Sequence, residues 1–177
     1  ASEAQRVLVV GPGPGDELPA LLNACADAAV TVLEPSELML EQCRRTLADH
    51  PGSSRCRLLP STLDEALKGE LSGTRFDLVV CHSVIHLLRS DEQAAMLREL
   101  TQCTAAGGVL LLSSECETDN SEDQHEVFKV AWQRLADRDV PADKIEAMKG
   151  SRNSVVFSLD PSRLAAGLKQ AGWRPPV

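Results

Sequence analysis

The sequence has no tyrosine, and aromatic residues make up only 3% of its 177 residues. Surfaces that bind single-stranded nucleic acids stack bases on aromatic side chains, for which this composition offers little material. Basic residues are also outnumbered, since 18 lysines and arginines stand against 26 aspartates and glutamates, a formal net charge of −8. Because a phosphate backbone is bound by clustered lysines and arginines, we expect no nucleic-acid partner.

No apolar run approaches the roughly 20 residues that span a bilayer, and the first residues lack the basic-then-apolar order of a signal peptide. The cysteines are spread out, with no C-x-x-C pair: Cys25, Cys43, Cys56, Cys81, Cys103 and Cys116. This spacing is typical of reduced thiols rather than of a disulfide framework or a zinc site. We therefore predict one cytoplasmic domain over residues 1–177, without membrane contact and without a metal site.

Short apolar runs alternate with helical segments along most of the chain. Five strands are predicted, at residues 7–10, 30–33, 56–59, 76–81 and 109–112. Runs that are continuously apolar, rather than alternating, indicate strands buried on both faces of a parallel sheet. The predicted fold class is therefore α/β, a doubly wound and mainly parallel sheet with helices on both faces.

Local signals predict the boundaries of three helices. The first helix is expected over residues 16–28, and a late helix over residues 141–150. Ser90 and Gln93 have the spacing of a capping box, in which the serine side chain caps the helix and the glutamine side chain reaches back. A helix is therefore expected to follow Ser90.

A glycine-rich loop follows the first predicted strand. Gly11, Gly13 and Gly15 have no Cβ atom, so the backbone can turn sharply there and a ligand can come close. In open parallel sheets, ligands bind beyond the carboxyl ends of the strands. Glu34 ends the second strand, 19 residues after Gly15, where a carboxylate can accept hydrogen bonds from both hydroxyls of a ribose. We therefore expect a ribose-bearing ligand at this edge.

The residue after the glycines indicates which ligand this is. The dinucleotide fingerprint G-x-G-x-x-G requires a third glycine where this sequence has Asp16. An aspartate would repel a pyrophosphate, whereas a ligand with no phosphate and a positively charged sulfonium tolerates an acidic rim. The charge of the loop thus favours S-adenosylmethionine over NAD.

Four segments resemble the class I S-adenosylmethionine-dependent methyltransferases of Rossmann-like fold, in order and in spacing. They are Val7–Gly15, Val32–Ser36, Phe76–His86 and Gly107–Leu111. The resemblance spans residues 6–114. It implies a cofactor-binding core over residues 1–114, followed over residues 115–177 by a helical lid, an acceptor region and a last helix.

The resemblance also implies a set of cofactor-binding residues. The glycine loop would wrap the methionine part of S-adenosylmethionine, Glu34 would hold the ribose, the segment after the third strand would lie beside the adenine, and the end of the fourth strand would pass under the methionine. The residues concerned are Gly11, Pro12, Gly13, Gly15, Glu34, Pro35, Ser61, Thr62, Leu63, Cys81, His82 and Ser83.

The activity implied by the resemblance is transfer of a methyl group to an oxygen or nitrogen atom of a small molecule. Such an enzyme mainly positions the acceptor atom in line with the departing sulfur. A general base helps where the acceptor must lose a proton. In a chain without tyrosine, the candidate catalytic residues are His86, one turn after the fourth strand, and Glu115, just past the fifth.

Residues 119–172 also resemble part of the carboxy-S-adenosylmethionine synthases, in which an arginine binds the additional carboxylate. Arg152 is the candidate for that role here. Two positions depart from the general family pattern, because Val9 stands where an acidic residue is usual and Ser61 where aspartate is frequent. Each change removes a charge-assisted acceptor worth roughly 1.5–3 kcal/mol. A domain that binds or scaffolds without catalysis is therefore an alternative.

The family usually has a helix before the first strand and two strands after the last helix. The sequence begins six residues before the first predicted strand, and it ends where the sixth strand of the family would begin. We therefore expect an edge of the sheet that needs another cover, for which a homodimer is a candidate.

Overall fold

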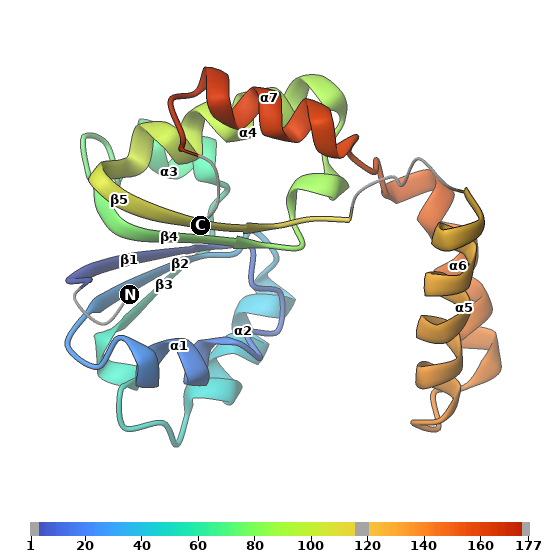
Figure 1. Cartoon of the computed structure of the whole chain (residues 1–177). Coiled ribbons are helices and arrows are strands. Elements are labelled where there is room, and N and C mark those ends of the chain that lie inside the picture. Colours follow the sequence, from blue (N-terminus) through green and yellow to red (C-terminus); the bar gives the residue numbers. More distant parts are fainter. Residues whose placement is uncertain (1–3, 116–120, 175–177) are drawn as a thin grey trace.

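The computed structural model describes residues 4–115 and 121–174, without the side chains of residues 121–125, 127 and 151–155. Strands and helices alternate through the first part, and three helices follow (Figure 1). The strands are β1 (Arg6–Val10), β2 (Ala29–Leu33), β3 (Cys56–Leu59), β4 (Phe76–His82) and β5 (Thr104–Ser113). The helices are α1 (Leu18–Ala24), α2 (Glu37–Leu47), α3 (Leu63–Lys68), α4 (Ser90–Cys103), α5 (Ser121–Ala136), α6 (Ala142–Val155) and α7 (Pro161–Gln170).

The five strands form one parallel sheet in the order β3-β2-β1-β4-β5. The chain moves outward from β1 to β3, and then crosses back to place β4 on the other side of β1. The order of the strands therefore reverses between β1 and β4, which is where ligands bind in doubly wound sheets. The predicted fold class is confirmed.

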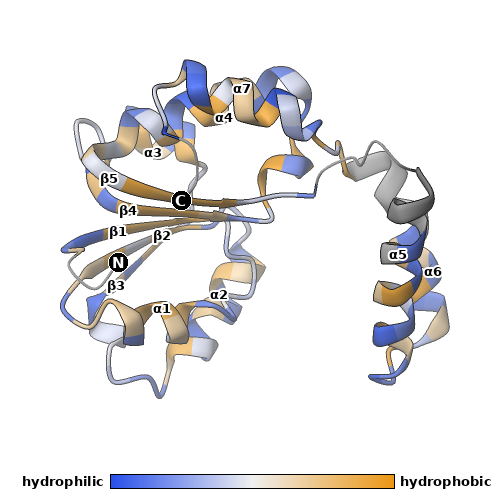
Figure 2. Ribbon diagram, in the orientation of Figure 1, coloured by the Kyte–Doolittle hydropathy of each residue, from blue (hydrophilic) through white to orange (hydrophobic). Residues whose placement is uncertain are grey.

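Helices α1 and α2 cover one face of the sheet, and α3, α4 and α7 cover the other (Figure 1). Successive side chains of a strand point to opposite faces. In β1, Val7 and Val9 pack in the core on the side of α1 and α2, while Leu8 and Val10 pack on the side of α3 and α4. Burial on both faces explains why the strands are continuously apolar, as their hydropathy colours show (Figure 2).

The last three helices do not form one unit. Helices α5 and α6 make a hairpin that stands away from the sheet (Figure 1). Helix α7 returns to pack on α4, and just beyond it the indole N–H of Trp173 donates to Thr101 Oγ1 at 2.8 Å. In the described part of the chain, no helix combines the length and apolarity needed to cross a membrane. None of the five cysteines described there forms a disulfide.

Two of the predicted helices have wrong boundaries. Helix α1 occupies only Leu18–Ala24 rather than residues 16–28, because Asp16 and Glu17 form a turn. The late helix α6 does not end near Gly150 but runs on to Val155.

The capping prediction at α4 is also wrong by one residue. Arg89, not Ser90, precedes the first helical residue. The carboxylate of Glu92 accepts a hydrogen bond from the backbone N–H of Arg89 at 2.8 Å. Gln93, the expected partner, turns into the protein instead, and is only 9% exposed.

Strand β5 lies at one edge of the sheet. It starts at Thr104, earlier than predicted, because residues on both sides of the glycine pair join β4 with a shift in register. Val109 and Leu111 are 48% and 51% exposed. The cover expected for this edge, a homodimer included, stays a prediction.

Arg55 ties the end of α1 to the start of β3. Its guanidinium donates to the carbonyl oxygens of Leu22, Cys25 and Ala28 at 3.0, 2.9 and 2.7 Å. Carbonyls at the end of a helix have no partner within the helix. We expect Arg55→Ala to lower the free energy of unfolding by about 2–3 kcal/mol, measured by urea denaturation.

A neighbouring arginine serves as the control. Arg57 makes an ion pair with Glu70 in which both side chains are more than half exposed. Surface pairs contribute roughly 0–1 kcal/mol, so Arg57→Ala should change stability by no more than that. Equal losses in the two variants would show that the carbonyl contacts of Arg55 are unimportant.

Candidate functional site

The loop after β1 turns at three glycines with positive φ angles, 63° at Gly11, 58° at Gly13 and 78° at Gly15. A Cβ atom on Gly15 would lie 2.9 Å from the sulfur of Cys43 and 2.8 Å from Leu18, so α1 and α2 pack directly against this glycine. A Cβ atom on Gly13 would meet no protein atom within 4 Å. The open side of the loop is therefore at Gly13.

Glu34 is 6% exposed and fixes this loop. Its Oε2 accepts the N–H of Gly13 at 3.0 Å, and its Oε1 accepts the N–H of Ser36 at 2.9 Å. A carboxylate has about four lone-pair positions, so each oxygen can accept another hydrogen bond. The carboxylate of Glu34, which is predicted to bind the ribose, is thus already oriented by the protein backbone. Both of its oxygens can still accept hydrogen bonds from a ligand.

The thiol of Cys43 holds the same loop from α2, since it donates to the carbonyl oxygen of Gly13 at 3.0 Å. Burial, and then the negative charge of Glu34, raise the pKa of Cys43 to about 11. The thiol therefore keeps its proton at neutral pH and remains a donor.

A cavity of about 410 Å³ opens beside the loop, at the carboxyl ends of β1 and β2 and between α3 and α4. Five of the predicted cofactor residues line it: Gly11, Pro35, Ser61, Thr62 and Leu63. Three carboxylates also line it, from Asp64, Glu92 and Glu99. Burial, and then the charge of Asp64, raise the pKa of Glu99. The cavity is therefore apolar with an acidic rim.

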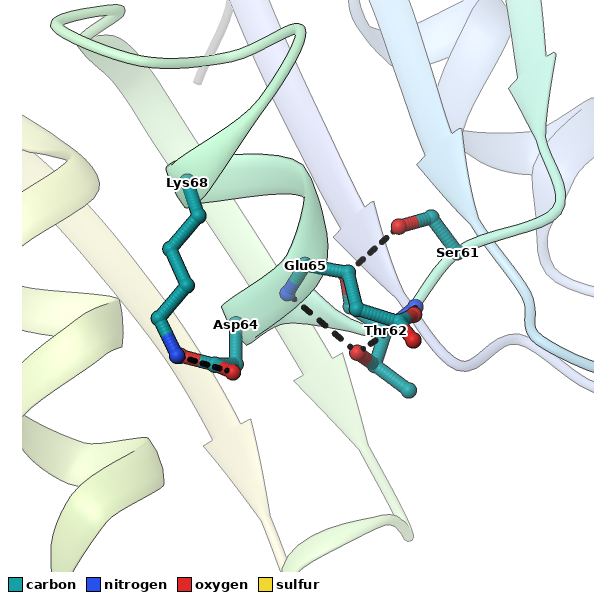
Figure 3. A network of polar contacts seen from close by, with 5 residues as sticks. All are labelled: Ser61, Thr62, Asp64, Glu65 and Lys68. Carbon is teal, nitrogen blue, oxygen red and sulfur yellow. Dashed lines mark hydrogen bonds and ion pairs between the residues drawn. The ribbon is translucent and has the colours of Figure 1, made fainter.

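The segment beside this cavity is held by its own hydrogen bonds (Figure 3). Thr62 caps α3, and the carboxylate of Glu65 accepts from the N–H and the hydroxyl of Thr62 at 2.9 and 2.8 Å. These bonds, the backbone one first, lower the pKa of Glu65. Ser61 Oγ donates to the carbonyl oxygen of Thr62 at 3.0 Å. The hydroxyl of Ser61 thus supplies no negative charge, and its proton is already donated to the backbone.

The remaining predicted cofactor residues do not line this cavity. Pro12, Gly13 and Gly15 belong to the adjoining loop, and Glu34 follows β2 beside it. Cys81 and His82 end β4, and Ser83 comes directly after that strand.

The side chain of Cys81 is fully buried in the core, so only its backbone can reach a ligand. The ring of His82 is hydrogen bonded through Nδ1 to Ser113 Oγ. Ser83 has a φ of 58°, which is uncommon for a residue other than glycine. The strained turn at Ser83 separates β4 from the segment that carries His86.

The two candidate catalytic residues lie together. The backbone N–H of Glu115 donates to His86 Nδ1 at 3.1 Å. The carboxylate of Glu115 in turn accepts from Ser158 Oγ at 3.1 Å. Since Nδ1 acts as an acceptor, the neutral ring of His86 carries its proton on Nε2.

Burial lowers the pKa of His86, although the charge of Glu115 opposes this effect. Folding therefore favours the neutral ring. The resulting stabilisation is present above the unfolded value of roughly 6.5 and is lost as the pH falls through the lower folded value. We expect NMR titration of the imidazole nitrogens to give a pKa below about 6.5, with the proton on Nε2 at higher pH. A higher pKa, or a proton on Nδ1, would contradict this geometry.

The family model described as "Methyltransferase domain" matches residues 8–110. The chain belongs to this methyltransferase-domain family. The matched residues cover the sheet from β1 to β5, the glycine loop, Glu34 and His86. Among curated protein sequences, none matches this methyltransferase domain.

Solved structures share the fold of the methyltransferase domain. An O-methyltransferase family protein from Burkholderia thailandensis superposes with a TM-score of 0.68 at 18% identity, over 98% of this chain and 47% of that protein. For mitomycin 7-O-methyltransferase the TM-score is 0.67 at 20% identity, over 97% and 43%. A glycopeptide N-methyltransferase complexed with S-adenosylmethionine gives 0.55 at 25% identity, over 66% and 50%. The chain spans about half the length of these proteins.

The resemblance to carboxy-S-adenosylmethionine synthases stays a prediction. Arg152 falls in α6, where its side chain lies outside the described residues. Among the side chains that the structure describes, no group of three or more from His, Cys, Asp or Glu could hold a metal ion.

Sequence reasoning missed some residues of the site. Glu92, Met96 and Glu99 line the 410 Å³ cavity from one face of α4. Their spacing of four and then three residues indicates that they share one face of a helix. The sequence does not indicate which part of the sheet that face covers. Ser158 lies 43 residues from its partner Glu115 in the sequence. No local sequence pattern predicts that contact.

Proposed function

We propose that this methyltransferase domain binds S-adenosylmethionine and transfers its methyl group to an oxygen or nitrogen atom of a small molecule. The observation that carries the proposal is the position of Glu34. Its buried carboxylate is fixed by two backbone N–H groups at the edge where the strand order reverses. It lies between the open side of the glycine loop and an apolar cavity. In S-adenosylmethionine the ribose likewise lies between the methionine part and the adenine, so Glu34 is placed to bind the ribose.

The charge of the site supports this cofactor over a dinucleotide. Asp64, Glu92 and Glu99 line the cavity, whereas none of its described lining residues is a lysine or an arginine. Lys68 pairs with Asp64 at 2.7 Å, so Glu92 and Glu99 are the lining carboxylates without such an ion pair among the described residues. Like charges repel most strongly where water is partly excluded. A pyrophosphate is therefore disfavoured here, whereas a sulfonium cation is not.

Methyl transfer breaks the bond between sulfur and the methyl carbon while the acceptor forms a new bond to that carbon. The cofactor supplies an activated methyl group, so the chain mainly has to position the acceptor. With its proton on Nε2, neutral His86 would orient an acceptor oxygen by donating a hydrogen bond. To act as a base it would have to offer Nδ1, and therefore release the N–H of Glu115. The carboxylate of Glu115 is the other candidate base.

A second candidate function is binding without catalysis. Val9 is 1% exposed and packs in the apolar core, and the hydroxyl of Ser61 bonds to the backbone. Neither position offers the charged acceptor that is usual in the family. Binding of S-adenosylhomocysteine without turnover of any oxygen or nitrogen acceptor would favour this alternative.

Calorimetric titration with S-adenosylhomocysteine tests the proposal. We expect a dissociation constant of roughly 1–100 μM, and no measurable heat from NAD at the same concentrations. Absence of heat from S-adenosylhomocysteine, with the protein folded and at high concentration, would refute both candidate functions.

A further inference from the structure

A second cavity, of about 270 Å³, lies between α4 and α7. None of the predicted cofactor or catalytic residues lines it. Its apolar part is formed by Leu97, Leu159 and Leu164. A Cβ atom on Gly167 of α7 would lie 3.1 Å from the end of Leu97, so the two helices approach closely beside the cavity. The volume exceeds the roughly 30 Å³ of one water molecule several times over.

A buried amide lines this cavity. Gln93 is 9% exposed, and its Nε2 donates to the carbonyl oxygens of Leu88 and Phe157, both at 2.9 Å. An amide nitrogen has two hydrogens, so these two bonds use both and fix the orientation of the group. Gln93 Oε1 accepts no hydrogen bond from any residue that the structure describes. Buried polar atoms normally have a partner, which indicates that a donor outside the described residues satisfies this oxygen.

Two arginines line the same cavity, Arg98 from α4 and Arg163 from α7. Neither guanidinium makes a hydrogen bond or an ion pair with a side chain that the structure describes. Asp160, the carboxylate among the lining residues, caps α7 and accepts from the hydroxyl and N–H of Ser162. These bonds, the hydroxyl one first, lower the pKa of Asp160. All of these bonds reach Oδ1, and the positive charge of Arg163 also lowers the pKa of Asp160. Two guanidinium groups therefore stand against one carboxylate among the lining residues that the structure describes, which leaves the cavity with an excess of positive charge.

We propose that the cavity between α4 and α7 is a second ligand site, which binds a small organic anion that carries a hydroxyl or ammonium group. Arg98 and Arg163 would bind its carboxylate or phosphate, because guanidinium groups match both geometries. Gln93 Oε1 would accept from the hydroxyl or ammonium group. The three leucines would exclude water from the rest of the ligand.

The position of this site connects it to the candidate catalytic pair. Gln93 joins α4 to the carbonyl of Phe157, whose N–H donates to the carbonyl of His86 at 2.6 Å. Ser158 lines the cavity and also donates to the carboxylate of Glu115. A bound anion would therefore contact Gln93 and lie in the same cavity as Ser158, two side chains that hold the segments on which His86 and Glu115 lie. The binding site itself does not depend on the proposed methyl transfer.

Calorimetric titration of the full chain with 3-phosphoglycerate tests this site, because that probe has a phosphate, a carboxylate and a hydroxyl. The matched probe is 3-(phosphonooxy)propionate, which keeps the carboxylate, the phosphate ester and their spacing but has no hydroxyl. We expect 3-phosphoglycerate to bind, and the matched probe to bind about tenfold more weakly, because it leaves Gln93 Oε1 without a donor.

Arg98 and Arg163 are exposed, so we expect their substitution to leave the fold intact. These variants distinguish binding at this site from non-specific attraction to the protein surface. We expect Arg98→Ala and Arg163→Ala each to weaken binding of 3-phosphoglycerate by about tenfold. Arg134→Ala removes an exposed arginine of α5, away from the cavity, and should bind as the parent does. Absence of binding at millimolar probe, or equal binding by the parent and the Arg98 and Arg163 variants, would overturn the proposal. Equal affinity for the two probes would show that Gln93 Oε1 does not bind the hydroxyl group, and would contradict that part of the proposal.

Discussion

Replacing Glu34 with glutamine is expected to weaken the binding of S-adenosylhomocysteine by about 10- to 100-fold, and to destabilise the fold as well. Both carboxylate oxygens accept a backbone N–H, one from Gly13 and one from Ser36. In glutamine, one oxygen becomes an NH₂ group that would face an N–H donor. One backbone donor then loses its partner, which costs about 1–3 kcal/mol where water is excluded. Glutamine is therefore not a conservative replacement at this position.

The matched control is Glu37→Gln, in the exposed first turn of α2. That change removes a carboxylate of the same size, whose interaction with the helix dipole is worth roughly 0.3–1 kcal/mol. Calorimetric titration and urea denaturation of both variants separate the two roles of Glu34. Unchanged ligand affinity in Glu34→Gln would show that this carboxylate does not hold the ribose.

Two glycines of the loop are expected to respond to alanine in opposite ways. Both have positive φ angles, so either substitution strains the backbone by roughly 1–2 kcal/mol. At Gly15 the new methyl group would also overlap Leu18 and Cys43, and overpacking adds about 1–3 kcal/mol. Gly15→Ala should therefore lower the free energy of unfolding by about 2–4 kcal/mol.

At Gly13 the new methyl group would meet no protein atom. It would occupy the open side of the loop, next to the N–H that Glu34 accepts, where the proposed cofactor comes closest. Gly13→Ala should therefore fold with the smaller loss of stability but bind S-adenosylhomocysteine at least about tenfold more weakly. Thermal denaturation should show the larger loss of stability in Gly15→Ala, and ligand titration should show the larger loss of affinity in Gly13→Ala. If one variant had the larger loss in both experiments, this account of the loop would be refuted.

The strands were predictable because their burial leaves a strong local signal. The parallel sheet is covered on both faces, so β1 and β4 appear as continuous apolar runs. Even the short β3 lies at the predicted residues, Cys56–Leu59. The start of α4 was misplaced because the residue before it uses its backbone N–H, not its side chain, and arginine carries no capping signal.

The candidate site was predictable to the extent that it follows from the carboxyl ends of parallel strands. The glycine loop and Glu34 had to share one edge of the sheet, because their strands run in the same direction. The second role of Glu34, as an acceptor for its own loop, depends on the path of Gly13 and has no sequence signal. The protonation of His86 likewise depends on Glu115, which lies 29 residues further along the chain.

A crystal structure of the chain with S-adenosylhomocysteine tests the central claim most directly. We predict that both ribose hydroxyls lie within hydrogen-bond distance of the Glu34 carboxylate, with the adenine in the cavity beside Ser61, Thr62 and Leu63. A nucleoside bound at another place on the molecule, with Glu34 still contacting only Gly13 and Ser36, would contradict it.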